Sequence, residues 1–217
     1  MANKAYPELA AALATMVGNI SQVLRANGYT GAPIKMILAG GMAINYWCGT
    51  RYTADVDASF SRRVILPGDD LIVQYTKANG QKAHIYFDTT YNPTLALMHE
   101  DYEDNAVPWP EVAAPNQLVR LYVLSPLDLA LSKVARFTEQ DREDIKALAH
   151  EGLVLASEFR ERATDALGAY VGNLAPVKTT IDMVSKDLAA IEAAKRQELH
   201  PRLAPTKSKP KDYGPTR

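Results

Sequence analysis

Cysteine is almost absent from this chain of 217 residues, which contains only Cys48. A single cysteine excludes an internal disulfide and a cysteine-based zinc cluster, and it fits a reducing compartment. No histidine and acid stand in a pattern that would support Cys48 as a nucleophile, so we expect a small buried residue. The chain also lacks a strong charge of one sign. Because the formal net charge is −1, any nucleic-acid binding would have to be local.

Segments that would direct the chain to a membrane are also missing. The N-terminal stretch has no basic region followed by an unbroken apolar core, which a signal peptide requires. No run approaches the roughly 20 apolar residues of a membrane span. We therefore expect a cytoplasmic protein with no membrane partner. The composition, 47% hydrophobic and 23% charged, is that of a globular chain able to bury a core.

Apolar periodicity and breaker residues divide the chain into helices and strands. Helices are predicted over 6–27, 42–47, 93–105, 139–152, 157–170 and 179–198, and from a Ser-Pro-Leu-Asp start at Ser125. Strands are predicted over 34–39, 54–60, 71–76, 82–89 and 118–124, with a loop at 108–110. Residues 201–217 hold four prolines, five basic residues and one acid, a composition that predicts disorder.

A glycine pair follows the first predicted strand. The apolar run over 34–39 leads into Gly40 and Gly41, and a short helix is expected directly after them. The missing Cβ atoms of these glycines allow a tight turn and the close approach of a ligand. A glycine turn that opens a helix offers backbone N–H groups and the positive helix end to phosphates.

Two aspartates lie within the next predicted strand. If residues 54–60 are extended, their period of two places Asp55 and Asp57 on one face. Adjacent carboxylates repel each other unless a cation lies between them, and Mg²⁺ is the usual ion for such a pair. A hairpin with a type I′ Asn-Gly turn is expected at 78–81. Its return strand ends near Asp88, which fits either a third carboxylate of the site or the end of a strand.

Basic residues near these acids are candidates for the same chemistry. Arg51 precedes the aspartates, where it would neutralise phosphate charge or brace a carboxylate. Lys133 is a candidate for the same electrostatic role, although by itself it also fits a solvated helix lysine. Asp141 and Asp144 are three residues apart and therefore share one face of a later helix.

Together these motifs resemble the signature of the polymerase-beta-like nucleotidyltransferase superfamily, in which a Gly-Gly or Gly-Ser pair precedes Asp-x-Asp. The fuller form over 40–57, GGMAINYW-x-G-x-R-x-T-x-DVD, is similar to the toxin-type branch, which includes the AbiEii abortive-infection toxins and the MenT-type toxins. The segments over 125–133 and 140–145 are similar to two further motifs of that branch. Gln140 stands where that branch commonly has Arg, and Gly41 where many superfamily members have Ser.

The resemblance implies a fold and a set of site residues. The implied fold is α/β (α+β), a nucleotidyltransferase domain with a mixed sheet flanked by helices over residues 1–124, followed by a helical C-terminal region over 125–200. The implied nucleotide-binding residues are Gly40, Gly41, Arg51, Thr53 and Lys133. The implied catalytic residues are Asp55, Asp57, Lys133 and Asp141, and the implied metal ligands are Asp55, Asp57 and Asp88.

The resemblance also implies an activity. This is the Mg²⁺- or Mn²⁺-dependent transfer of a nucleoside monophosphate from an NTP to an acceptor hydroxyl, of the EC 2.7.7 type. For the toxin branch the implied acceptor is an RNA, such as a tRNA 3′ end, with a cognate antitoxin in a toxin–antitoxin or phage-defence system.

Other functions stay open. One is the modification of a small molecule such as an antibiotic, and another is a catalytically idle fold that serves as an antitoxin or binding module. The glycines also fit an ordinary turn, and the aspartates an exposed edge strand. The intact aspartate pair argues against an idle fold, because such a fold has no reason to keep that repulsion.

Overall fold

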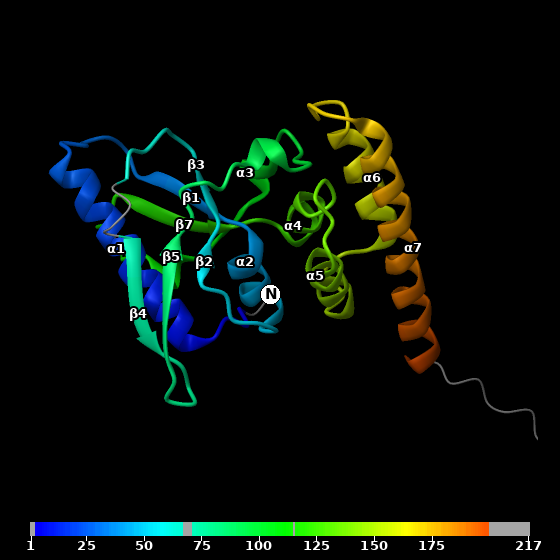
Figure 1. Cartoon of the computed structure of the whole chain (residues 1–217), viewed down its shortest axis with the longest axis horizontal. Helices are drawn as coiled ribbons and strands as arrows, with labels where there is room; N and C mark the ends of the chain where they lie inside the picture. Colours follow the sequence, from blue (N-terminus) through cyan, green and yellow to red (C-terminus); the bar gives the residue numbers. More distant parts are fainter. Residues whose placement is uncertain (1–2, 67–70, 115, 200–217) are drawn as a thin grey trace, which may run out of the picture.

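Strands and helices alternate along the first part of the chain and helices alone follow, as the computed structural model in Figure 1 shows. The structure describes residues 3–66, 71–114 and 116–199. The predicted disordered tail over 201–217 lies outside these residues. Within them the strands form two mixed sheets, so the predicted α/β architecture with flanking helices is confirmed.

The larger sheet has the strand order β3-β1-β7-β6. Its strands are β3 Ala58–Phe60, β1 Ile34–Leu38, β7 Val119–Val123 and β6 Val107–Pro108. β1 pairs in parallel with β7 and antiparallel with β3, and β6 pairs antiparallel with β7. Buried apolar residues on the two central strands place this sheet in the core. The edge strand β6 falls where a loop was predicted, and an edge position is one of the few that tolerate Pro108 in a strand.

The smaller sheet corrects the prediction of one continuous strand over 54–60. Its order is β2-β5-β4, with β2 Asp55–Val56, β5 Lys82–Phe87 and β4 Ile72–Thr76. β2 pairs with β5 in this sheet, whereas β3 pairs with β1 in the larger one. The extended segment is therefore divided between two sheets, and Asp57 lies at the point of division. The backbone on either side of Asp57 is held by strand pairing in a different sheet, and together the two pairings position its side chain.

The hairpin between β4 and β5 forms as predicted, but its turn is of another type. Gly80 has a φ of 83° and donates its N–H to the carbonyl of Lys77. Among the described residues Phe137 is the one non-glycine with a positive φ, so Asn79 does not take the positive φ that a type I′ turn requires. The positive φ is needed at the glycine alone.

Most predicted helices are present, with shifted ends. They are α1 Pro7–Ala26, α2 Gly40–Cys48, α4 Pro126–Ser132, α5 Glu139–His150, α6 Ala156–Ala166 and α7 Leu174–Leu199. α7 begins earlier than predicted, because Pro176 lies in its first turn, where proline is tolerated. By length and composition alone α1 is long and apolar enough to cross a membrane, although the sequence predicted no membrane span. A buried core helix passes the same test, and Leu13, Met16 and Ile20 of α1 are fully buried.

The predicted helix over 93–105 is wrong. The segment contains the single turn η2 Pro93–Leu95 and the short helix α3 Tyr102–Asn105. The Asn92 side chain accepts from the backbone N–H of Thr94 and so caps one turn only. Between the two turns Asp101 forms an ion pair with Arg162 of α6 at 2.6 Å, a tertiary contact that local sequence cannot show.

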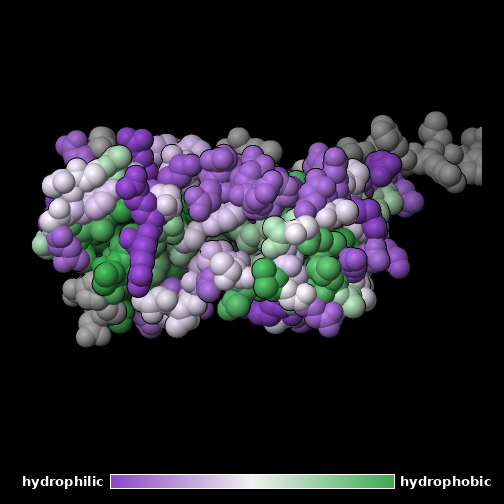
Figure 2. All heavy atoms as spheres, turned by 90° about the horizontal axis from the view of Figure 1, so that it is seen from above, coloured by the Kyte–Doolittle hydropathy of each residue, from purple (hydrophilic) through white to green (hydrophobic). Residues whose placement is uncertain are grey.

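The C-terminal helices pack directly on the strand-containing part. α4 and α5 both contact α2, and Nε1 of Trp47 in α2 donates to the carbonyl of Leu124 at 2.9 Å. α7 lies along α5 and α6 at the far side of the molecule (Figure 1). Seen from above, polar residues cover much of the middle of the molecule, and apolar patches are exposed on both sides of it (Figure 2).

Candidate active site

The turn at Gly40 is built so that a carboxylate can lie against it. Gly40 is the first residue of α2 and has a φ of 53°, a conformation that favours glycine. A Cβ atom at this position would lie 1.8 Å from Oδ2 of Asp57. The backbone N–H of Ala39 donates to the carbonyl of Asp57 at 2.8 Å and so fixes the two segments together. The glycine pair and the aspartate pair of the sequence motif therefore form one local structure.

Gly41 is also closely packed, but against other residues. Its Cβ would lie 2.9 Å from Cβ of Thr53 and 3.0 Å from Nη2 of Arg51. The structure thus places two predicted nucleotide-binding residues behind the glycine turn. Arg51 is occupied there by Asp144, whose Oδ1 and Oδ2 both accept from its Nη1 at 3.2 Å. Of its two predicted roles, the structure shows Arg51 bracing a carboxylate.

Two acids, Asp57 and Asp88, line the space in front of α2, and Asp55 lies close enough to act on Asp57 through its charge. Asp57 is half-buried, and burial together with the charges of Asp88 and Asp55 raises the pKa of its carboxyl. Asp88 directly follows β5, and its Oδ1 accepts from the backbone N–H of Thr90 at 2.7 Å. No group of three or more His, Cys, Asp or Glu side chains within the described ranges is arranged to hold a metal ion. The acids are electrostatic neighbours, and their assignment as metal ligands stays a prediction.

Positive charge lies on the other side of the same space. Lys133 is 5% exposed, and its Nζ lies 2.7 Å from Oδ2 of Asp144 and 3.5 Å from Oδ1 of Asp141. Gln140 also donates to Asp144, at 3.1 Å. Arg136, in contrast, has a side chain that is 74% exposed. Lys133 is therefore buried within its ion pairs, whereas Arg136, which pairs with Asp141, keeps most of its side chain accessible to a ligand.

Asp141 is buried and organises the start of α5. Its Oδ2 accepts from the backbone N–H and the hydroxyl of Thr138, which completes a capping box. Arg136 donates to both of its carboxylate oxygens, at 2.8 and 3.0 Å. Burial alone would raise the pKa of Asp141, but the hydrogen bonds from Arg136 and Thr138 outweigh it and hold this pKa well below the usual range. The geometry supports a positioning role for Asp141 rather than proton transfer.

A cavity of about 290 Å³ joins the two sides of the site. Of the predicted site residues, the cavity is lined by Gly40, Asp57, Asp88, Lys133 and Asp141. Asp55 lies outside its lining, on the exposed surface of β2.

Sequence reasoning missed several residues of this site. Asp144 binds Arg51, Lys133 and Gln140. Its spacing of three residues from Asp141, which places both on one helix face, was the sequence feature that could have indicated this role. Tyr91 lines the cavity, and burial together with the charge of Asp57 raises the pKa of its hydroxyl, which keeps it protonated. No sequence motif pointed to Tyr91. The prediction for Cys48 is confirmed, because it is buried and burial raises the pKa of its thiol to about 12.

The chain matches a known protein family over most of its length. The family described as "Nucleotidyltransferase of unknown function (DUF6036)" matches residues 12–195, which include both the strand-containing part and the C-terminal helices. No curated protein and no solved structure matches the chain. The match supports the resemblance to the nucleotidyltransferase superfamily and does not extend to the toxin-type branch.

Proposed function

Because the chain belongs to this family of nucleotidyltransferases of unknown function, we propose that it transfers a nucleoside monophosphate from an NTP to an acceptor hydroxyl. The observation that carries the proposal is the carboxylate of Asp57, packed on Gly40 at the start of α2. The raised pKa of Asp57 and its two acidic neighbours favour a bound cation there. The accessible Arg136 on the opposite side of the cavity favours an anionic ligand.

The donor chemistry of the site fits a hard divalent cation. Asp57, with Asp55 and Asp88 as its neighbours, would hold such an ion through carboxylate oxygens, the ligands that Mg²⁺ prefers. When bound, such an ion polarises the phosphates and activates the acceptor hydroxyl. Mn²⁺ has the same preference for oxygen ligands.

Groups of the protein itself bind the triphosphate, neutralise its charge and accept the proton. The backbone N–H groups at the start of α2 bind the triphosphate, because they have no acceptor within the helix. Arg136, held by Asp141, neutralises phosphate charge. The acceptor oxygen bonds to the α-phosphorus, and the bond from this phosphorus to pyrophosphate breaks. Since Thr90 binds Oδ1 of Asp88, we assign Oδ2 of Asp88 as the atom that receives the hydroxyl proton.

The proposed acceptor is an RNA, such as a tRNA 3′ end. The sequence motifs shared with toxin-type nucleotidyltransferases over 40–57, 125–133 and 140–145 support this assignment. They also support a role as the toxin of a cytoplasmic toxin–antitoxin or phage-defence pair, in which a cognate antitoxin protein is the partner.

The proposed activity is tested by incubating the purified protein with Mg²⁺ and each NTP labelled at the α-phosphate. Acceptors are total tRNA and a panel of aminoglycoside and lincosamide antibiotics. We expect label in the tRNA, abolished by Asp57→Ala and retained by Asp165→Ala, which removes an exposed aspartate of α6. Label in a drug would replace the RNA acceptor by a small molecule. If no acceptor is labelled by the wild type or by Asp57→Ala, the protein is not this kind of enzyme.

A further inference from the structure

A second and larger cavity, of about 640 Å³, adjoins the proposed active site. Asp88, Tyr91 and Asn92 line both cavities and form the boundary between them. The volume lies in the range of pockets that take organic ligands of drug size. A molecule in the larger cavity would therefore meet the Asp88 carboxylate where the two cavities join.

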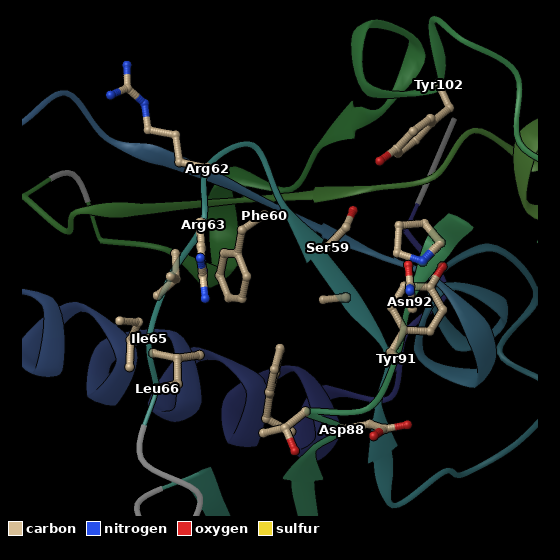
Figure 3. A pocket seen from close by; sticks show the side chains of 15 residues that line it. Ser59, Phe60, Arg62, Arg63, Ile65, Leu66, Asp88, Tyr91, Asn92 and Tyr102 are labelled. Atoms are coloured by element: carbon tan, nitrogen blue, oxygen red, sulfur yellow. The ribbon is translucent and has the colours of Figure 1, made fainter. Parts of the chain in front are cut away.

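The lining of this larger cavity combines aromatic rings with arginines. Phe60 and Phe87 pack at a centroid distance of 5.6 Å. Tyr102 lies across the cavity from Phe60 (Figure 3). Arg63 lies beside Phe60, and Arg62 extends outward from the same edge (Figure 3). Both arginines are exposed.

This combination selects among acceptors by charge and shape. Asp88 is the single acid among the described lining residues, against the two arginines. A polycationic antibiotic would be repelled by these arginines and would need more carboxylates than the single one, Asp88, that the described lining supplies. Aromatic faces with arginine at the edge are the surface on which single-stranded nucleic acids bind, with bases stacked and phosphates neutralised.

We propose that this larger cavity is the acceptor site and that it binds the terminal nucleotide of a single-stranded RNA. The base lies among Phe60, Phe87 and Tyr102, the preceding phosphates lie on Arg62 and Arg63, and the 3′ hydroxyl is presented to Asp88. The assignment rests on the proposed nucleotidyl transfer, in which this hydroxyl attacks the α-phosphorus. It adds to that function the place where the acceptor binds and the residues that bind it.

The binding test uses the full chain without NTP or metal. The fluorescence anisotropy of a short RNA, labelled at its 5′ end, is measured against protein concentration at several salt concentrations. The Arg62→Ala/Arg63→Ala variant is compared with Lys178→Ala/Lys186→Ala, which removes the same charge from exposed positions of α7. Each phosphate contact to a single strand contributes about 0.7 to the salt slope. We expect the arginine variant to lose about 10-fold in affinity and about 1.4 in slope, and the lysine variant to match the wild type.

Two further measurements separate a built site from general attraction. An RNA that carries a 3′ phosphate places negative charge beside Asp88, so we expect it to bind at least about 5-fold more weakly than the 3′ hydroxyl form. Tyr102→Leu removes a stacking surface and Tyr102→Phe keeps it, so only the leucine variant should weaken binding. Thermal unfolding of each variant shows that the loss does not come from misfolding.

The outcomes distinguish this inference from the function on which it rests. Equal RNA binding by the arginine variant and the wild type, or indifference to the 3′ phosphate, would overturn the acceptor site. Undiminished transfer to a protein or an antibiotic by the arginine variant would also overturn it, while the proposed enzyme activity would stand. RNA binding that depends on Arg62 and Arg63, with no transfer under any condition, would keep the binding site and refute the enzyme.

Discussion

Gly40 excludes a side chain for two separate reasons, its positive φ and the carboxylate of Asp57 beside it. Gly40→Ala should lower the free energy of unfolding by at least about 1–2 kcal/mol, the cost of a Cβ atom in the left-handed region. It should also abolish nucleotidyl transfer, because Asp57 must move away. Urea denaturation and the labelling assay measure the two effects.

Gly28 offers a matched control for this variant. It has a φ of 76°, but among the described residues no heavy atom beyond its own chain neighbours lies within 4 Å of the position of its Cβ. Gly28→Ala should therefore reduce stability by a similar backbone term and leave transfer unchanged. If Gly40→Ala retained activity like Gly28→Ala, the contact between the glycine turn and Asp57 would not matter to the reaction.

Asp57 should reduce the stability of the protein when no cation is bound. Its raised pKa means that the folded state disfavours the ionised carboxylate. At neutral pH Asp57→Asn should thus raise Tm, by roughly 2–4 °C if the repulsion is worth about 1 kcal/mol. The gain should vanish as the pH falls through the raised pKa toward the ordinary value of 3.8, because the wild-type carboxyl is then protonated too.

Addition of Mg²⁺ provides a second reading of the same site. A cation that binds only the folded protein raises its Tm, so Mg²⁺ should stabilise the wild type and have little effect on Asp57→Asn. Asp165→Asn, at an exposed position of α6, should respond like the wild type. A Tm of Asp57→Asn below that of the wild type at neutral pH would show that Asp57 is not under repulsion.

At the scale of single residues, the sequence identified the acids and glycines of the site. It did not identify the partners that hold the basic side chains of Arg51 and Lys133 in place. The contact of Gly40 with Asp57 was implicit in the motif, because both segments were assigned to one site. The pair of Arg51 and Asp144 joins residues 93 positions apart, and no local pattern specifies such a pairing. The sequence therefore predicts which charged residues belong to the site better than it predicts what each buried charge does there.

Among the elements, the turn between α4 and α5 depends on a buried set of charges. Lys133 and Asp144 are both buried, and removing one partner leaves the other without compensation. Lys133→Met or Asp144→Leu alone should lower the free energy of unfolding by about 3–5 kcal/mol. The double variant should lose less than the sum of the two.

The measurement for this set of charges is a double-mutant cycle in urea, with the KM for NTP determined for each variant that folds. A large coupling energy assigns Lys133 chiefly to holding α5. If Lys133→Met instead left stability unchanged and raised KM, its role would be direct contact with the nucleotide. Lys186→Met, at an exposed position of α7, controls for the loss of a lysine charge.

Elements were predicted well where their signals are local. The apolar stripe of α1 and the cap at Ser125, which accepts from Asp128, lie within a few residues of the helices they define. The prediction of one helix over 93–105 failed because its pattern did not show that Asn92 caps a single turn or that Asp101 pairs with the distant Arg162. The division of the Asp-x-Asp strand was also hidden, since an alternating pattern cannot show that two halves pair with different sheets.

For the whole molecule, the division into domains at residue 124 stays a prediction that unfolding can test. Arg51 pairs with Asp144 across this point, and Asp101 pairs with Arg162 across it as well. We therefore expect one cooperative transition. Both tryptophans, Trp47 and Trp109, precede the division, whereas most of the helical residues, in α4–α7, lie after it.

Tryptophan fluorescence therefore reports on residues 1–124 alone, whereas circular dichroism at the helix band also reports on α4–α7, which hold most of the helical residues. Their urea transitions should coincide, with equal midpoints and equal slopes. Arg51→Ala should move both curves together. Separate midpoints would show instead that the helical region over 125–200 unfolds as an independent domain.

The change of sheets at Asp57 also restricts how this chain can vary in length during evolution. One residue inserted between Asp55 and Ala58 would slip the pairing with β5 or with β1, and a slip of one reverses the faces of a strand. Insertions in the hairpin at 77–81 do not fall between strands that pair in two different sheets. Relatives of this protein should accordingly differ in length at the hairpin and keep the Asp-x-Asp spacing fixed. The strand pairing of both sheets depends on the number of residues between Asp55 and Ala58.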